Sequence, residues 1–300
     1  MTKYLIETKN LTKKFGSFTA VEGVNLKVPN GEIYGFLGPN GAGKSTTIRM
    51  LLGLIKMTSG EVNIFEKSIT KNRVNILSKI GSIVESPSYY GNLTAYENLD
   101  IIRNILKQEK EQVLKALKIV GLMDAKDKLV KKYSLGMKQR LGIAQSLIGK
   151  PDLLILDEPT NGLDPAGIQE IRKLIIDLPK KMGITVLISS HILNEIELMA
   201  NHIGIINKGN LLFQGPIKEL QSMNKPKIKI KAEPKKGAIK KINELKYKFV
   251  ENDDFITIKD DVDIAELNKE LVYSGHSVFH ISQEDRSLED IFLDLTRKEA

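Results

Sequence analysis

The sequence predicts a two-domain α/β protein, in which a mostly parallel sheet covered by helices precedes a small α+β domain. Over roughly the first 222 residues, short apolar runs alternate with amphipathic segments. Composition changes abruptly after the segment SMNKP, and the chain beyond it has short strand-like and helix-like patterns. Apolar runs that alternate with helices are typical of parallel strands buried on both faces.

The expected elements of the first domain, residues 1–222, follow from this alternation. Its buried strands are IYGFLG (33–38), KIGSIV (79–84), DLLILD (152–157), TVLISS (185–190) and HIGIIN (202–207). The first thirty residues predict an antiparallel strand pair, and residues at about 94–150 predict a helical subdomain. Helical patterns such as IQEIRKLIIDL fall between the strands.

Residues 223–300 predict an accessory α+β domain. Its patterns follow the β-α-β-β-α-β order of ferredoxin-like folds, and SLEDIFLDLT adds a final helix. Residues 225–248 carry ten lysines against two glutamates, whereas residues 249–300 carry five basic and fourteen acidic side chains. These opposite charges favour pairing within the domain, and a lipid-binding lysine surface is the alternative.

Composition excludes several kinds of protein. The net charge of +8 suits an acidic ligand or an anionic membrane surface, but it is too diffuse to indicate a nucleic acid partner. The chain has no cysteine, and its four histidines lack metal-binding spacing. It shows neither a signal peptide nor a run of 18 apolar residues, so we expect a cytosolic protein, soluble or peripheral to a membrane.

A phosphate loop lies between the strand IYGFL and the helical pattern TTIRMLLGLI. The candidate nucleotide-binding residues are Gly38, Pro39, Asn40, Gly41, Ala42, Gly43, Lys44, Ser45 and Thr46. Glycines let the backbone turn its N–H groups toward a phosphate chain, and the helix that follows adds its positive end. Lys44 would contact the β- and γ-phosphates and Ser45 would hold Mg²⁺, so the sequence predicts a nucleoside triphosphate site.

The segment LLILDEP (153–159) predicts the acidic half of that site. Asp157 ends a buried strand at the edge where open α/β sheets bind ligands, and there it can hold magnesium. Glu158 follows it and is placed to activate a water for attack on the γ-phosphorus. We therefore predict that Asp157 is a metal ligand and Glu158 the general base.

The segment YSLGMKQR (133–140) predicts a second helix start suited to a phosphate. Ser134 is placed as its N-cap, and Gly136 permits a close approach. A phosphate loop surrounds the triphosphate from one side only, and hydrolysis needs charge stabilisation on the other side. A helical subdomain would carry this helix start away from its own nucleotide, so we expect a head-to-tail dimer.

Taken together, GPNGAGKST, YSLGMKQR, LDEPTNGLDP and ISSH resemble the ATP-binding subunit of an ABC transporter over roughly residues 4–220. The segment IVESPSYYGNLTAYENL and the appended C-terminal domain resemble those of the bacitracin-resistance and lantibiotic-immunity branch. The resemblance implies a P-loop ATPase that uses ATP and Mg²⁺. It also implies a homodimer or pseudo-dimer, held by a separate membrane-spanning permease at the inner face of the cell membrane.

The resemblance also assigns roles to single residues. Phe15 matches the aromatic that stacks on adenine, or is an ordinary strand aromatic. His191 matches the catalytic histidine that orients Glu158. Asp164 matches a loop that contacts the partner subunit, or is a turn or cap residue. Glu85 stands where the family has a glutamine that binds magnesium, so it is a metal ligand or a plain loop residue.

This sequence departs from the family's signature Leu-Ser-Gly-Gly-Gln at Tyr133, Leu135 and Met137, but it keeps the serine and the glycine that contact phosphate in the family. We therefore expect its role to persist. The resemblance also places Tyr89, Tyr90 and Leu93 in the segment that contacts the permease, with a local core as the alternative.

The expected function is ATP-driven transport, with export of a peptide antibiotic, or immunity to one, as the implied purpose. Two alternatives stay open. The first is a soluble ABC ATPase that acts on ribosomes or DNA, although the single cassette and the short helical insert disfavour it. The second is a nutrient importer subunit, because the catalytic motifs serve both directions of transport.

Overall fold

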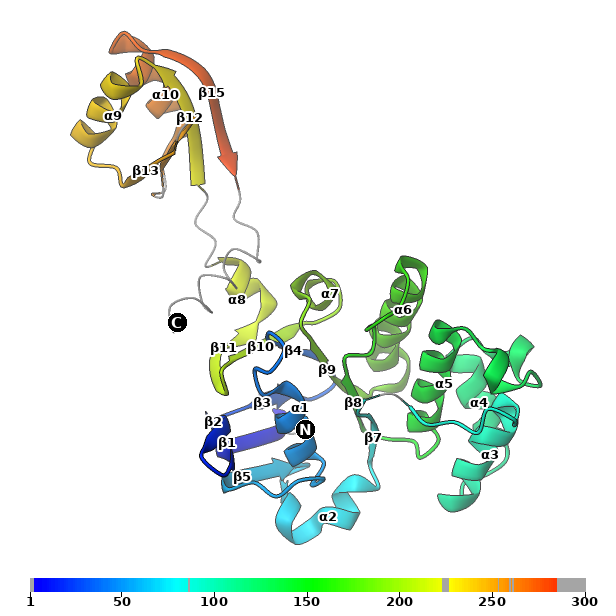
Figure 1. Cartoon of the computed structure of the whole chain (residues 1–300). Helices are drawn as coiled ribbons and strands as arrows, with labels where there is room; N and C mark the ends of the chain where they lie inside the picture. The colour runs from blue at the N-terminus through cyan, green and yellow to red at the C-terminus, as the bar shows by residue number, and fades with distance from the viewer. Residues whose placement is uncertain are drawn as a thin grey trace. The chain divides into compact units, whose positions relative to one another are not determined.

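A computed structural model of the chain describes residues 3–85, 87–222, 227–252, 254–258, 260 and 262–284 (Figure 1). The chain forms two compact units, Met1–Ile217 and Lys218–Ala300, and each is described by itself. Within the described ranges, no helix combines the length and the hydrophobicity that crossing a bilayer requires.

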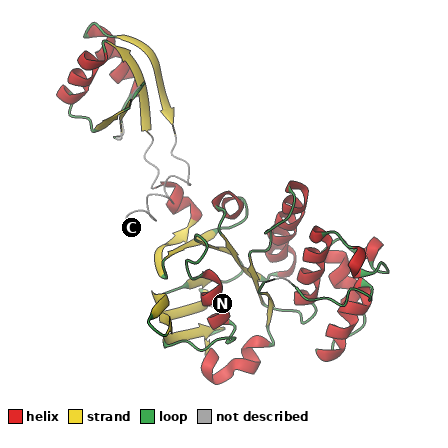
Figure 2. Cartoon of the chain, viewed as in Figure 1, coloured by secondary structure: helices red, strands yellow, loops and turns green. Residues whose placement is uncertain are grey.

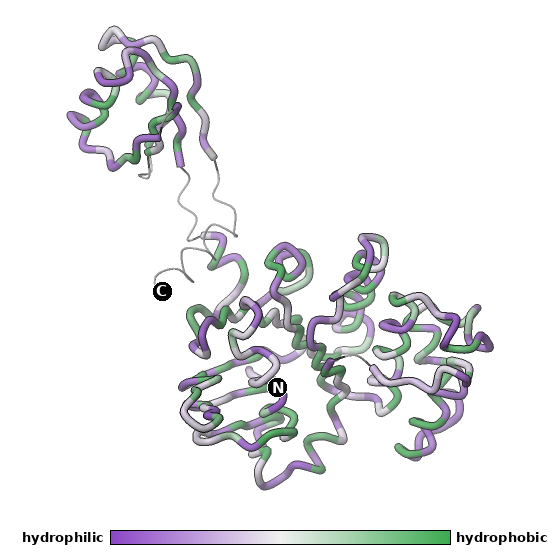
Figure 3. The backbone as a smooth tube through the Cα atoms, viewed as in Figure 1, coloured by the Kyte–Doolittle hydropathy of each residue, from purple (hydrophilic) through white to green (hydrophobic). Residues whose placement is uncertain are grey.

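The centre of the first unit is a six-stranded sheet in the order β11-β10-β4-β9-β8-β7. Its strands are β4 (Ile33–Leu37), β7 (Ile80–Ile83), β8 (Leu153–Asp157), β9 (Thr185–Ser190), β10 (His202–Asn207) and β11 (Asn210–Pro216). All neighbours pair in parallel except β10 and β11. Every residue of β4, β8 and β9 is buried, and β8 and β9 lie in the hydrophobic centre in Figure 3. The five expected parallel strands are confirmed, and β11 adds an antiparallel edge that the sequence analysis did not include.

A second, antiparallel sheet precedes and flanks the phosphate loop. It contains β1 (Tyr4–Phe15), β2 (Phe18–Val24), β3 (Lys27–Pro29), β5 (Ser59–Ile64) and β6 (Lys67–Ser68). The expected pairing within the first thirty residues is confirmed, because β1 runs antiparallel to both β2 and β3. Buried side chains of this sheet, such as Val28 of β3, share one core with Phe36 of β4 and Ile48 of α1 (Lys44–Leu51). This shared core holds α1 between the two sheets.

The helices within residues 95–147 cluster at one side of the first unit and form the expected helical subdomain (Figure 2). The remaining α-helices of this part are α2 (Ile69–Leu77), α3 (Ala95–Ile105), α4 (Glu111–Ile119), α5 (Leu135–Leu147), α6 (Pro165–Met182), α7 (Leu193–Glu197) and α8 (Ile217–Ser222), the last at the boundary between the units. Two short 3₁₀ helices, η1 (Met123–Ala125) and η2 (Val130–Lys132), connect α4 to α5. Helix α3 starts with a capping box, in which the Thr94 hydroxyl accepts from Glu97 N and the Glu97 carboxylate accepts from Thr94 N.

The second unit has the strand and helix order expected of a ferredoxin-like fold. It contains β12 (Lys227–Glu233), α9 (Lys235–Glu244), β13 (Phe249–Glu251), β14 (Ile256–Ile258), α10 (Ile264–Tyr273) and β15 (Ser277–Glu284), and its sheet order is β13-β14-β12-β15 with every pair antiparallel. The expected final helix SLEDIFLDLT lies outside the described residues.

Ion pairs join the basic and acidic segments of this unit. Lys241 Nζ of α9 lies 2.8 Å from Glu270 Oε2 of α10, and Lys235 Nζ lies 3.1 Å from Glu251 Oε1. The bond to Lys241 lowers the pKa of Glu270. Each of these exposed pairs contributes little to folding stability. They show that α9 of the basic segment pairs with β13 and α10 of the acidic segment.

Candidate active site

The phosphate loop connects β4 to α1, and its backbone depends on glycine. Gly41 and Gly43 have φ angles of 79° and 108°, in the left-handed region that side chains disfavour. A Cβ atom at Gly38 would lie 2.3 Å from the carbonyl oxygen of Ile206 in β10. The loop therefore tolerates no side chain at Gly38, and it curls over the N-terminus of α1, where backbone N–H groups attract anions.

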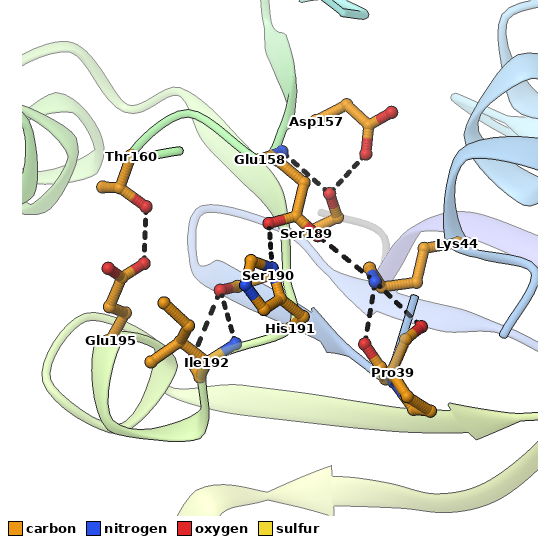
Figure 4. Close-up of polar contacts among 11 residues, drawn as sticks. Pro39, Lys44, Asp157, Glu158, Thr160, Ser189, Ser190, His191, Ile192 and Glu195 are labelled. Carbon is orange, nitrogen blue, oxygen red and sulfur yellow. Dashed lines mark hydrogen bonds and ion pairs between the residues drawn. The ribbon is translucent and has the colours of Figure 1, made fainter. Parts of the chain in front are cut away.

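Lys44, the first residue of α1, points back into this loop (Figure 4). Its Nζ donates to Gly38 O at 2.7 Å and to Pro39 O at 3.2 Å, and lies 3.2 Å from Glu158 Oε1. The residue is only 5% exposed. The ammonium charge is therefore satisfied by loop carbonyls and one carboxylate, and these are the contacts that a phosphate chain would compete with.

Asp157 and Glu158 stand at the carboxyl end of β8, as expected, and Ser189 of the adjacent β9 fixes both. Asp157 pairs in register with Ser189, whose Oγ donates to Asp157 Oδ1 at 2.5 Å and accepts from Glu158 N at 3.0 Å. Glu158 has φ of 50°, which turns the chain sharply after the strand. Ser189 was not among the residues predicted for the site. The signal that could have found it is the shared edge of the expected strands 152–157 and 185–190.

His191 lies beside Glu158. Its Nδ1 is 2.8 Å from Glu158 Oε2, while Oε1 of the same carboxylate faces Lys44 (Figure 4). The structure thus brings the three residues expected to act on the γ-phosphate into one contact network. Ser190 Oγ accepts from Ile192 N at 3.0 Å and so holds the backbone that follows His191.

A buried pair that was not predicted from the sequence joins the segment after Glu158 to the segment after His191. Thr160 Oγ1 donates to Glu195 Oε2 at 2.5 Å, and both residues are almost fully buried. Thr160 follows Glu158 in the chain, whereas Glu195 belongs to α7, which follows His191. The pair therefore fixes the Glu158 loop to the element that positions His191.

The phosphate loop opens into a cavity of about 500 Å³. It is lined by Phe15, Phe18, Ala20, Asn40, Gly41, Gly43, Lys44, Ser45, Thr46, Glu158, Asn161 and His191. Phe15 is 50% exposed at the end of β1 and pairs with Phe18 across the turn. Lys13 Nζ lies 4.7 Å from the Phe15 ring centroid. The accessible ring of Phe15 can stack on a base, and Phe18 offers a second aromatic face that the sequence analysis did not consider.

Ser134 and Gly136 lie at the start of α5, as expected. Ser134 is the N-cap, and its Oγ accepts from Met137 N at 3.2 Å. Neither Ser134 nor Gly136 is among the described residues that line the phosphate-loop cavity. Asp164 caps α6, where its Oδ1 accepts from Gly167 N at 2.9 Å, and its side chain is exposed. The cap role is therefore observed for Asp164, and its exposure leaves it accessible to a partner.

Glu85 is exposed, has φ of 69° and forms an ion pair with Arg49 of α1. It lines a second cavity, of about 680 Å³, together with Asp157 and Glu158. The carboxylates of Glu85, Asp157 and Glu158 thus line the same cavity. The ion pair with Arg49 provides a partner for Glu85 that the sequence analysis did not foresee.

The segment expected to contact the permease is only partly open. The Tyr89 hydroxyl donates to Lys138 O of α5, and burial raises the pKa of this phenol. Leu93 is half-buried, and Tyr90 is 61% exposed. For Tyr89 the structure therefore shows packing within the chain, whereas Tyr90 presents its ring to the surface.

A phosphate loop after one parallel strand, with a carboxylate pair at the end of another strand of the same sheet, defines a P-loop nucleoside triphosphatase. The family described as "ABC transporter" matches residues 21–161. The chain belongs to the ATP-binding subunits of ABC transporters, which hydrolyse ATP and work with membrane permeases.

Two curated relatives are transport ATP-binding proteins. The bacitracin transport ATP-binding protein BcrA of Bacillus licheniformis is 48% identical over 296 residues, which covers 97% of each chain. The lantibiotic transport ATP-binding protein SrtF of Streptococcus pyogenes is 49% identical over 210 residues, which covers 70% of this chain and 90% of that protein. The expected family and branch are thereby confirmed.

Solved structures of the same family confirm the expected fold. The cbiO1 subunit of Clostridium perfringens superposes with a TM-score of 0.68 at 30% identity, covering 81% of this chain and 96% of that chain. A cassette solved as a dimer in a post-hydrolysis state, with ADP and Pi, superposes with a TM-score of 0.63 at 27% identity. It covers 71% of this chain and 98% of that chain.

Proposed function

We propose that two copies of this chain clamp two ATP molecules between them, each nucleotide held by the phosphate loop of one copy and by Ser134 and Gly136 of the other. The observation that carries the proposal is the placement of Ser134. It caps the N-terminus of α5, and helix N-termini attract anions, yet it is not among the described residues that line its own chain's phosphate-loop cavity. The structure of a similar cassette as a dimer supports this arrangement.

Within each clamped site, different residues bind the phosphates, activate the water and stabilise the developing charge. Lys44 places its positive charge on the terminal phosphates. Glu158, oriented by His191, takes a proton from the attacking water. The water oxygen bonds to the γ-phosphorus as the bond to the β-phosphate oxygen breaks, so the products are ADP and phosphate. The helix start of the second copy stabilises the charge on the outer γ-oxygens, and Asp164 contacts the first copy's phosphate loop.

The residues around this site fit a magnesium ion bound with the nucleotide. Ser45, Asp157 and Glu85 offer hydroxyl and carboxylate oxygens, the hard donors that Mg²⁺ prefers. One oxygen of Asp157 accepts from Ser189, and the residue also lines the cavity of about 680 Å³, where a ligand could reach it. When bound, the ion would neutralise the negative charge of the phosphates and so favour attack of water on the γ-phosphorus.

The absence of cysteine from the chain allows a direct test of the clamped dimer. One protein carries Asn40→Cys in the exposed phosphate loop and another carries Leu135→Cys at the exposed start of α5, both with Glu158→Gln to prevent turnover. Mixing them with ATP should give a disulfide-linked dimer, because residue 40 of one copy then faces residue 135 of the other. Neither protein alone should crosslink.

A matched control replaces Leu135→Cys with Val74→Cys, which is also exposed but belongs to α2. It should not crosslink to Asn40→Cys with ATP. If the first mixture gives no ATP-dependent crosslink, or if light scattering shows only monomers at saturating ATP, the clamped dimer is wrong.

We further propose that the ATPase works at the inner face of the cell membrane, on a separate permease that moves a peptide antibiotic of the bacitracin or lantibiotic kind. Support comes from the names of relatives that match 97% and 70% of this chain. Tagged chain purified from native membranes should bring a hydrophobic permease with it, whereas co-purified ribosomes or DNA would favour the soluble alternative. Of Tyr89 and Tyr90, Tyr90 has the exposed ring that such a permease contact requires.

The proposed cargo is tested in a susceptible bacterium that expresses the chain with the permease so identified. Active protein should raise the inhibitory concentration of bacitracin or of a lantibiotic, and the Glu158→Gln protein should not. An antibiotic that acts inside the cell serves as the unrelated control. Unchanged sensitivity to every peptide tested, despite ATPase activity, would contradict the cargo and leave the ATPase assignment standing.

A further inference from the structure

Tyr89 connects the segment that follows β7 to the helix that starts with Ser134. Its hydroxyl donates to the carbonyl oxygen of Lys138, one turn into α5. Burial raises the pKa of the phenol, so it remains a protonated donor over the physiological range. Since the bond goes to backbone, it fixes the position of the helix itself and does not depend on which side chain occupies position 138.

The surface of α5 is shaped to receive this ring. Gly142 lies one turn after Lys138, and a Cβ atom there would come within 2.8 Å of the Tyr89 hydroxyl oxygen and 2.7 Å of Pro87 Cγ. Gly142 is fully inside the helix, where glycine is otherwise unfavourable. The contact between Tyr89 and α5 therefore requires glycine at this position.

The same segment also contacts α1, the helix that follows the phosphate loop. Glu85 forms an ion pair with Arg49, on the helix that begins at Lys44. Glu85 and Tyr89 both line the cavity of about 680 Å³ that reaches Asp157 and Glu158. One short stretch of chain thus contacts α1 in its last turn and α5 near its start. The N-termini of these two helices are proposed to hold opposite sides of ATP in the dimer.

We propose that Tyr89 is a positioning residue, which sets the angle at which the Ser134 end of α5 meets the partner's nucleotide. This inference rests on the proposed clamped dimer. Loss of the hydroxyl should leave ATP binding to the single chain unchanged, because the Lys44 loop is intact. It should weaken closure of the dimer, because α5 then lacks one of its fixed points.

The test measures both steps in the full chain with Glu158→Gln. The variant Tyr89→Phe removes only the hydroxyl, and Tyr273→Phe removes an exposed hydroxyl from α10 as a matched control. ATP affinity is measured by equilibrium fluorescence below the protein concentration at which dimers form. Dimer dissociation is measured by analytical ultracentrifugation at saturating ATP. Thermal melts of the variants provide the check on folding.

With Tyr89→Phe, the dimer dissociation constant should rise roughly twofold to tenfold, at most the effect of one neutral hydrogen bond, with single-chain ATP affinity as in the control and the chain still folded at the assay temperature. An unchanged dimer constant overturns the inference. An equal loss of single-chain ATP affinity also overturns it, because Tyr89 would then support its own phosphate loop. If the Glu158→Gln parent forms no dimer with ATP, the proposed function fails first and the inference fails with it.

Discussion

Replacing Glu158 with glutamine tests the central charge arrangement of the site. In the structure this carboxylate has two partners, since Oε1 faces Lys44 Nζ at 3.2 Å and Oε2 faces His191 Nδ1 at 2.8 Å. The substitution removes the negative charge and keeps the size of the side chain. It should affect hydrolysis and nucleotide affinity in opposite directions.

The size of both effects follows from these contacts. The amide still accepts a hydrogen bond from the Lys44 ammonium, but the attraction between two opposite charges is lost, which is worth about 1 kcal/mol. Phosphates then compete more easily for Lys44, and ATP should bind roughly fivefold more tightly. Without its general base, hydrolysis should slow by a factor of about 10²–10⁴.

The assay combines steady-state phosphate release with equilibrium binding of ATP. Glu111→Gln, an exposed change on α4, serves as the control and should leave both values unchanged. Hydrolysis by Glu158→Gln at the parental rate would refute the role of Glu158 as base. Unchanged or weaker ATP binding would refute the competition between this carboxylate and the phosphates for Lys44.

Three more predictions come from single contacts. Lys44→Ala should weaken ATP binding at least about tenfold by titration, because charged hydrogen bonds to phosphate are lost; parental affinity would exclude Lys44 from the site. Thr160→Val leaves the buried Glu195 carboxylate without its hydroxyl partner, so it should lower the free energy of unfolding by about 1–3 kcal/mol in denaturant titrations; no loss would show that the pair is dispensable. Thr94→Ala removes the N-cap of α3 and should cost about 1 kcal/mol at pH 7 by the same measurement. The hydrogen bonds from Thr94 lower the pKa of Glu97, so the folding stability that they add is complete above pH 4.5 and is lost as pH falls through the lowered pKa. The difference in unfolding free energy between Thr94→Ala and the parent should therefore shrink in acid, and a difference that grows in acid would contradict this origin.

Most of the first unit could be predicted because its signals are local. An apolar run such as LLILD can only be buried, and alternation with helices makes the sheet parallel. The phosphate loop is predictable for a similar reason, since its glycines, lysine and serine are adjacent in sequence and act through one backbone turn. The strand β11 was missed because it is an edge strand of mixed polarity, without the wholly apolar run that marked its neighbours.

The residues that complete the site could not be predicted, because their partners are far away in the chain. Ser189 contacts Asp157 across 32 residues, Thr160 meets Glu195 across 35, and Tyr89 reaches Lys138 across 49. A serine, a threonine or a tyrosine has no distinctive spacing of its own. Each becomes informative only when strand register or helix packing sets its neighbour.

By itself, the sequence determined that this chain has a parallel sheet, a phosphate loop and a carboxylate pair, since each depends on residues within one short segment. Tertiary structure alone decided that Glu158 lies between Lys44 and His191, and that α5 is fixed through Tyr89. The physical reason is that hydrogen bonds and ion pairs act over a few ångströms, and only folding brings residues from separate segments within that distance.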